Sequence, residues 1–212
     1  MKSSSDRGLT RSGGGLYFPD RMLSRRCSAA CALAVLGLAL LAACSDSLGL
    51  PPATIANKVD TVTLYALSGT PFTTPSAYAL NGAVAVRTDQ TTAFDFAFNI
   101  IDPLSQAVLV PSGALRLPRT PGLQRSSSAF SAITMAPIDG YDLDNPLVVT
   151  PGAVVVVRSR SLSCADGRTE SLYAKLRVLA VDTSSAVRSI RFEILTDQNC
   201  GYLGLQPGLP AQ

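Results

Sequence analysis

Apolar and polar residues alternate in short segments along most of this chain, and turn residues separate the segments. Residues 59–67, 94–101 and 171–181 show the pattern most clearly. A period of two is typical of strands that bury one face. Similar segments predict further strands at residues 83–87, 107–110, 114–117, 147–149, 153–163 and 187–196.

Glycine and proline mark the ends of these predicted strands. The chain has 16 Gly and 14 Pro, spaced at strand-length intervals, and Asn81-Gly82 is the strongest turn signal. Loops are expected at residues 118–128 and 137–146. No segment keeps a helical period of 3.6 residues, although residues 129–135 fit either a short helix or a strand.

This punctuation predicts an all-β fold. An antiparallel β-sandwich, Ig-like in the broad sense, and a partly open barrel both fit the pattern. The chain has no Trp, so the core signature of a true Ig domain is absent.

The most regular apolar stripe lies in the predicted strand at residues 94–101. Four apolar side chains should share one face: Phe94, Phe96, Phe98 and Ile100. Asp95 and Asn99 alternate with them and should point to the other face. An aromatic run of this kind is more often core than ligand platform, so we expect the stripe to be buried.

A different apolar segment lies near the start of the chain. Arg25 and Arg26 precede an apolar run at residues 29–43, which is shorter than the roughly 20 residues that a bilayer-spanning helix needs. The run ends in Leu41-Ala42-Ala43-Cys44. A basic start, a short apolar middle and a small-residue exit make up a secretory signal. With the cysteine, residues 22–45 resemble the signal peptide and lipobox of bacterial lipoproteins.

The resemblance implies a processing pathway for this chain. A diacylglycerol is joined to the Cys44 thiol, the leader is removed, and the new amino group is acylated, which gives stable attachment to a bilayer. An uncleaved membrane helix and a soluble secreted protein are the two alternatives. Ser45 is not the Asp associated with inner-membrane retention, so the resemblance favours the outer membrane of the cell envelope.

The chain is therefore expected to have four parts. Residues 1–21 are a polar extension ahead of a better start at Met22, and residues 22–43 are the signal peptide. Residues 44–57 form a lipidated tether, and residues 58–212 form a single domain that is long enough for a sizeable core.

Removal of the leader changes the charge of the protein. The whole chain has a formal charge of +3, but six of its 18 basic and two of its 15 acidic residues lie in residues 1–43. The remainder has 12 basic and 13 acidic residues, a charge of about −1. This balance gives no reason to expect a nucleic-acid partner.

Removal of the leader also changes the cysteine count. Cys27 and Cys31 are lost with it and Cys44 takes the lipid, which leaves Cys164 and Cys200. In an oxidising compartment a disulfide is the default for such a pair.

Most enzyme signatures are missing. Without His the chain has no Ser-His-Asp triad and no His-based metal site, and neither a Gly-x-Ser-x-Gly elbow nor a phosphate-binding loop occurs. Scattered carboxylates give no basis for choosing a glycosidase pair. We expect neither an enzyme nor a bound cofactor.

Two weak binding sites remain. The acidic segment with Asp139, Asp142 and Asp144 has hard oxygen ligands for Ca²⁺, although its spacing differs from that of an EF-hand. Alternation on neighbouring strands also predicts a basic face for an anionic ligand, with five members: Arg158, Arg160, Lys175, Arg177 and Arg191. The ordinary alternatives are a solvated turn and the wet face of a sheet.

The sequence thus predicts a membrane-anchored envelope lipoprotein that acts as a non-enzymatic interaction or structural module, with a protein or glycan partner in the envelope. A module that binds a small ligand, a glycan or Ca²⁺ is the alternative. A concave pocket would favour the binding module, and a flat exposed patch would favour the interaction protein.

Overall fold

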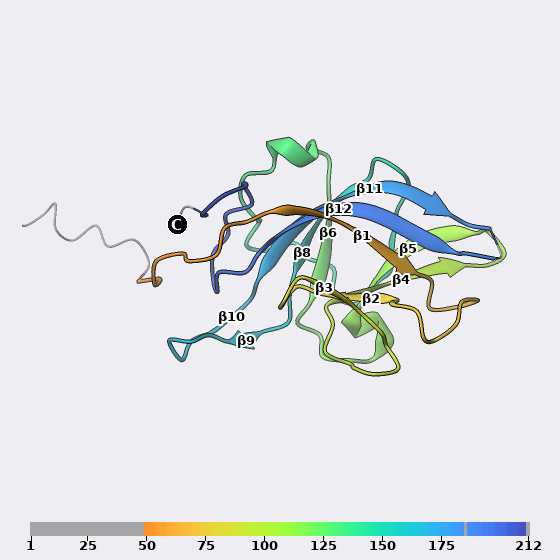
Figure 1. Ribbon diagram of the computed structural model, residues 1–212, viewed down its shortest axis with the longest axis horizontal. Helices are drawn as coiled ribbons and strands as arrows, with labels where there is room; N and C mark the ends of the chain where they lie inside the picture. Colours follow the sequence, from red (N-terminus) through yellow and green to blue (C-terminus); the bar gives the residue numbers. More distant parts are fainter. Residues whose placement is uncertain (1–48, 185, 211–212) are drawn as a thin grey trace, which may run out of the picture. The chain divides into compact units, whose positions relative to one another are not determined.

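Two five-stranded antiparallel sheets pack face to face in the computed structural model, which describes residues 49–184 and 186–210 (Figure 1). One sheet has the strand order β1-β12-β11-β8-β6 and the other β3-β2-β4-β5-β7. The sheets do not close into a barrel. The predicted all-β fold of antiparallel sheets is therefore confirmed.

The first sheet contains β1 (Val59–Tyr65), β6 (Gly122–Ser126), β8 (Val154–Arg158), β11 (Tyr173–Asp182) and β12 (Ser189–Asp197). The second contains β2 (Ala77–Ala79), β3 (Val84–Val86), β4 (Phe96–Ile101), β5 (Gln106–Pro111) and β7 (Leu147–Val148). A small separate hairpin is formed by β9 (Leu162–Ser163) and β10 (Thr169–Glu170). The only helical elements in the described residues are two 3₁₀ turns, η1 (Ser112–Leu115) and η2 (Phe130–Ala132).

The core lies between the two sheets and is built around three aromatic rings. Tyr78 on β2, Phe96 on β4 and Phe192 on β12 are fully buried, with ring centroids 5.7–6.2 Å apart. Because β12 belongs to one sheet and the other two strands to the opposite sheet, the rings hold the layers together. Burial of large aromatic side chains dominates core stability.

The aromatic stripe of β4 is buried as expected, with one correction. Phe96, Phe98 and Ile100 belong to the main core, whereas Phe94 packs in a separate cluster with Ala97 on the other face of the second sheet. The alternation fails at Phe94 because β4 begins only at Phe96. Asp95 does not face solvent either, since it is 1 % exposed.

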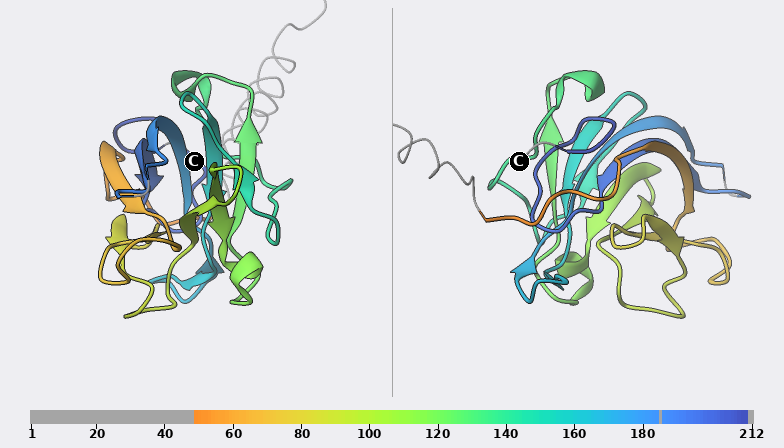
Figure 2. Two further views of the ribbon diagram at one scale, coloured as in Figure 1. Left: turned by 90° about the vertical axis from the view of Figure 1, so that its right-hand side faces the viewer. Right: turned by 60° about the vertical axis from the view of Figure 1, so that its left-hand side comes forward.

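β11 and β12 form a hairpin and cover most of the predicted strands at residues 171–181 and 187–196. The register runs from Tyr173 opposite Asp197 to Asp182 opposite Ser189, with a bulge near Leu179. Alternate residues of β12 enter the core, as the pattern predicts. Figure 2 shows these two long strands from two further directions.

Three of the predicted segments are wrong. Residues 114–117 do not form a strand, because η1 and Arg116 in the left-handed region turn the chain there. The predicted loop at residues 118–128 contains β6, and the predicted strand at 153–163 is divided into β8 and β9. β6 has little strand character of its own, but it pairs along the free edge of β8. Such pairing depends on tertiary context.

The two terminal segments of the described chain pack on each other. The sequence assigns residues 51–57 to the tether, yet Asn57 is 3 % exposed and exchanges backbone hydrogen bonds of 2.7 and 3.0 Å with Gly208. The Tyr202 hydroxyl donates to the Pro51 carbonyl over 2.7 Å. The chain is thus part of the fold from Pro51 onward.

Cys164 and Cys200 form the predicted disulfide. The bond links the β9–β10 hairpin to the segment that follows β12, across a sequence separation of 36 residues. A closed loop of this length restricts the unfolded chain by about 4 kcal/mol on the chain-entropy estimate.

We therefore expect the double variant Cys164→Ser/Cys200→Ser to lose about 4 kcal/mol of unfolding free energy, because its unfolded state regains that freedom. Denaturant unfolding of both proteins measures the difference. An unchanged midpoint would show that the core alone holds the hairpin in place.

Candidate functional site

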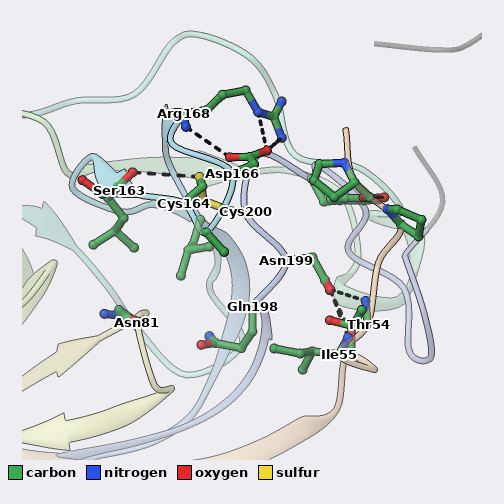
Figure 3. Close-up of a pocket in the computed structure, with 16 residues that line it drawn as sticks. Thr54, Ile55, Asn81, Ser163, Cys164, Asp166, Arg168, Gln198, Asn199 and Cys200 are labelled. Atoms are coloured by element: carbon green, nitrogen blue, oxygen red, sulfur yellow. Dashed lines mark hydrogen bonds and ion pairs between the residues drawn. A yellow bond between two sulfur atoms is a disulfide. The ribbon is translucent and has the colours of Figure 1, made fainter. Parts of the chain in front are cut away.

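A cleft of about 470 Å³ opens at the end of the sandwich where the described chain begins (Figure 3). Three segments that are distant in sequence surround it: residues 51–55, the β2–β3 turn at Asn81, and the β9–β10 hairpin. Its floor is the stretch that follows β12. Two other cavities have volumes of about 430 and 370 Å³, so this cleft is the largest of the three and is the candidate site.

Each of the three residues that follow β12 binds one of these walls. Asn199 holds the N-terminal wall: its Oδ1 accepts from the Thr54 and Ile55 N–H groups over 2.9 and 3.0 Å. Its Nδ2 donates to the Ile55 carbonyl over 2.8 Å. Each such hydrogen bond contributes about 1 kcal/mol to the free energy of unfolding. One buried amide therefore fixes residues 54 and 55.

The neighbours of Asn199 hold the other two walls. Gln198 donates to the Leu80 carbonyl and accepts from the Gly82 N–H, which attaches the β2–β3 turn. Cys200 is bonded to Cys164 in the β9–β10 hairpin. Three consecutive side chains, all visible in Figure 3, thus build the cleft.

Asp95 does not line the cleft, but it holds the β2–β3 turn that forms one of its walls. It accepts from the Leu80 N–H over 2.7 Å and from the Arg160 N–H over 2.8 Å, so it joins the β2–β3 turn to the chain that leaves β8. Burial raises the pKa of this carboxyl. Because both Asp95 carboxylate oxygens accept hydrogen bonds from backbone N–H groups, this side chain has a structural role.

The charged side chains in the cleft neutralise each other. Arg168 donates from Nε to Asp166 over 2.7 Å and lies 4.0 Å from Glu170. The Arg168 backbone N–H and then its side chain lower the pKa of Asp166. A carboxylate with a lowered pKa is a poor general base at neutral pH.

The rest of the lining is largely apolar. Ile55 is 48 % exposed at the rim, and Leu162 and Leu172 line the cavity beside the disulfide. Apolar walls with a few polar groups are typical of binding sites, and the volume lies within the range of small-ligand pockets. The arrangement is suited to binding.

One member of the predicted basic face, Lys175, is covered by other parts of the chain. Lys175 is 2 % exposed, and its Nζ donates to the carbonyls of Phe130 and Ile133 over 2.8 and 2.7 Å. Burial lowers the pKa of this amine. Residues 130–136 and 203–205 pack on this part of the sheet, so it forms a second small core.

The other four basic residues do not form one open patch. Arg158 lies over the Tyr141 ring, 5.0 Å from its centroid, and Arg177 pairs with Glu193 over 2.7 Å. Arg160 lies beyond β8, next to Asp95. Arg191 is exposed on the outward face of β12, as predicted. Arg158, Arg160 and Arg177 therefore each make a contact of their own.

Lys175 gives a testable consequence of this arrangement. We expect Lys175→Met to lose about 2 kcal/mol of unfolding free energy, because two loop carbonyls lose a charged donor. Denaturant unfolding measures the loss, and Lys58→Met, at an exposed position, is the matched control. Equal stability of the two variants would contradict the structural role of Lys175.

The acidic segment does not assemble into a cation site. Asp142 Oδ1 accepts from the N–H groups of Asp144 and Asn145 over 3.0 and 2.9 Å, and these bonds lower its pKa. Asp144 pairs with Arg119. Within the described part of the chain, no three His, Cys, Asp or Glu side chains gather as metal ligands. Asp142 thus stabilises the turn, and Asp144 belongs to a surface ion pair.

Cys44 and the whole apolar leader lie outside the described residues. In the ranges that are described, no helix has the length and apolar character needed to cross a bilayer.

The sequence does not predict the cleft. Its hydrogen bonds join residues up to 151 positions apart, and the only signals in the sequence are the cysteine pair and the Asn81-Gly82 turn. No protein-family model matches the chain, and comparison with curated proteins gives no match. The functional argument therefore depends on the chemistry of the cleft and on the Cys44 motif.

Proposed function

We propose that this protein is a lipid-anchored module of the bacterial cell envelope that binds a partner in the cleft and has no enzymatic activity. The observation that carries the proposal is the position of the N-terminal wall. Pro51 lines the cleft and follows the Cys44 motif by a few residues, which span roughly 25 Å at most. A partner bound there is held close to the membrane surface, with the outer membrane favoured by the resemblance.

The chemistry of the cleft supports binding over catalysis. Among the described residues, the Thr54 and Ser163 hydroxyls that line the cleft are hydrogen-bonded to no carboxylate or amine, and Asp166 is paired with Arg168. A nucleophile of this kind needs such a base for activation. The concave shape favours a glycan or another small ligand of the envelope, because the cavity volume of about 470 Å³ suits one. An envelope protein is the second candidate.

The anchor is tested by Cys44→Ser. We expect this variant to lose incorporation of a labelled fatty acid and to leave the membrane fraction or accumulate unprocessed, because the acceptor thiol is gone. Cys31→Ser, within the leader, is the matched control and should be labelled normally. Labelled and membrane-bound Cys44→Ser protein would overturn the proposed anchoring.

The cleft is tested by photo-crosslinking in intact cells. A photoreactive residue in place of Asn81, which is exposed and lines the cleft, should give a discrete adduct. The same residue in place of Thr92, which is exposed elsewhere, should not. Ile55→Glu should reduce the Asn81 adduct by placing a charge at the apolar rim. Equal labelling at both positions would contradict a binding role for the cleft.

A further inference from the structure

β1 forms one edge of the first sheet. It stands first in the strand order, and its seven residues pair with β12 without a register shift. Figure 2 shows this strand, in orange, at the outer side of that sheet. No residue of β1 lines the cleft, so its free edge is a surface separate from the proposed binding site.

The odd-numbered residues of β1 direct their backbone groups away from β12. Tyr65, the last residue of the strand, donates its N–H to the Pro75 carbonyl over 2.9 Å. The next residue, Ala66, donates to the Arg188 carbonyl over 2.8 Å, directly before the start of β12. Successive residues of an antiparallel strand point their N–H and C=O groups to opposite sides. The even-numbered residues of β1 therefore bond to β12, and the odd-numbered residues face outward.

Three residues of β1 leave these outward groups open. Among the described residues, no other segment hydrogen-bonds to the outward N–H and C=O groups of Val59, Thr61 and Thr63. All three residues are exposed. A row of open donors and acceptors on a sheet edge is a template for pairing with another chain. An extended backbone presents the complementary groups at the same spacing.

The other edges of the two sheets are shorter or covered. β3 has three residues and β7 has two. On β6, Leu123 exchanges two backbone hydrogen bonds of 2.9 Å with Asp142. Long edges are commonly protected by proline, lysine or a bulge, and residues 59–63 contain none of these. The open edge of β1 is therefore suited to an added strand.

A second copy of this chain does not fit this edge. At one end of the open stretch, Asn57 is bonded to Gly208 through both of its backbone groups. At the other end, Tyr65 is bonded to Pro75. Asn57 and Tyr65 are equally distant from Thr61 in sequence, so an antiparallel copy centred there would place its Tyr65 opposite Asn57, where Gly208 already lies. A different centre moves one of the bonded ends further into the open stretch, whereas a short segment that leaves the sheet avoids both ends.

The Asp60 side chain favours a basic residue in the added strand. It lies on the same side of β1 as Val62 and Leu64, which pack on the core, but it is exposed. Within the described ranges it takes part in no ion pair. Asp60 and the residue opposite it would form a pair without mutual hydrogen bonds, in which side chains are closest. Opposite charges at such positions stabilise strand pairing.

We propose that β1 accepts an extended segment of another polypeptide as an added antiparallel strand, with a Lys or Arg of that segment opposite Asp60. The open stretch takes about five residues, which span roughly 17 Å. The backbone groups of Val59, Thr61 and Thr63 supply the affinity, and the charge pair fixes the register. Pairing at this edge requires no ligand in the cleft.

The test titrates the peptide acetyl-Thr-Val-Thr-Lys-Thr-amide into the full-length protein in detergent, with amide exchange followed by NMR. In the antiparallel register its Lys lies opposite Asp60 and its central Thr opposite Thr61. In the protein alone, the N–H groups of Thr61 and Thr63 should exchange fast, and those of Val62 and Leu64 should exchange slowly. The peptide at saturation should slow the first two by about tenfold or more and leave the other two unchanged.

N-methylated peptides and two variants are the matched controls. A methyl group on the central Thr nitrogen removes the donor that faces β1 and should abolish the protection, whereas a methyl group on the Val nitrogen, which points away, should not. Thr61→Pro should also abolish it, because the ring replaces an N–H that does not pair with β12. Thr61→Val keeps the N–H and should behave as the wild type.

Asp60→Lys tests the charge without a change of backbone. This variant should bind the Lys peptide about fivefold more weakly than the wild type does, and it should prefer a peptide with Glu in place of Lys. Equal binding of both peptides to both proteins would contradict the basic partner residue. Slow exchange of the Thr61 N–H in the protein alone would show that the edge is already covered, and equal effects of the two methylated peptides would exclude strand pairing. Either result would overturn the proposal, and neither bears on the Asn81 adducts that test the cleft.

Discussion

The three side chains that follow β12 hold three separate segments of this fold in place. β12 lies between β1 and β11, so both neighbours fix its path. Beyond it, Gln198, Asn199 and Cys200 each attach a separate segment. These segments have short strands or none, and backbone pairing alone would hold them weakly. Side-chain amides and one disulfide supply the attachment that sheet ladders supply elsewhere.

Buried polar side chains show how the loops of this protein are attached to its sheets. The core between the sheets is almost entirely apolar and aromatic, and it explains the sandwich. The polar residues that are buried, Asp95, Lys175 and Asp197 among them, instead join loops to sheets. Each costs desolvation energy unless its partners are in place. The loops are thereby restricted to one arrangement.

Much of the architecture could be predicted from the alternation of apolar residues. The β11 and β12 strands and the burial of Phe96 and Phe98 follow from the local pattern, and the disulfide follows from the small number of cysteines in the domain. β6 could not be predicted, because its pairing with β8 compensates for weak local propensity. The cleft and the burial of Lys175 depend on contacts between segments far apart in sequence. Alternation places Lys175 on the outward face, but it cannot show that residues 130–136 cover that face.

The pairing of Asn57 with Gly208 brings the entry and the exit of the folded unit to the same end. A fusion partner or affinity tag added after the tail emerges beside residues 51–55 and competes for the mouth of the cleft. The turns that join β4 to β5 and β11 to β12 lie at the other end of the unit (Figure 1). Reporter insertions for studies in living cells belong in those turns, where they leave the end with the cleft unobstructed.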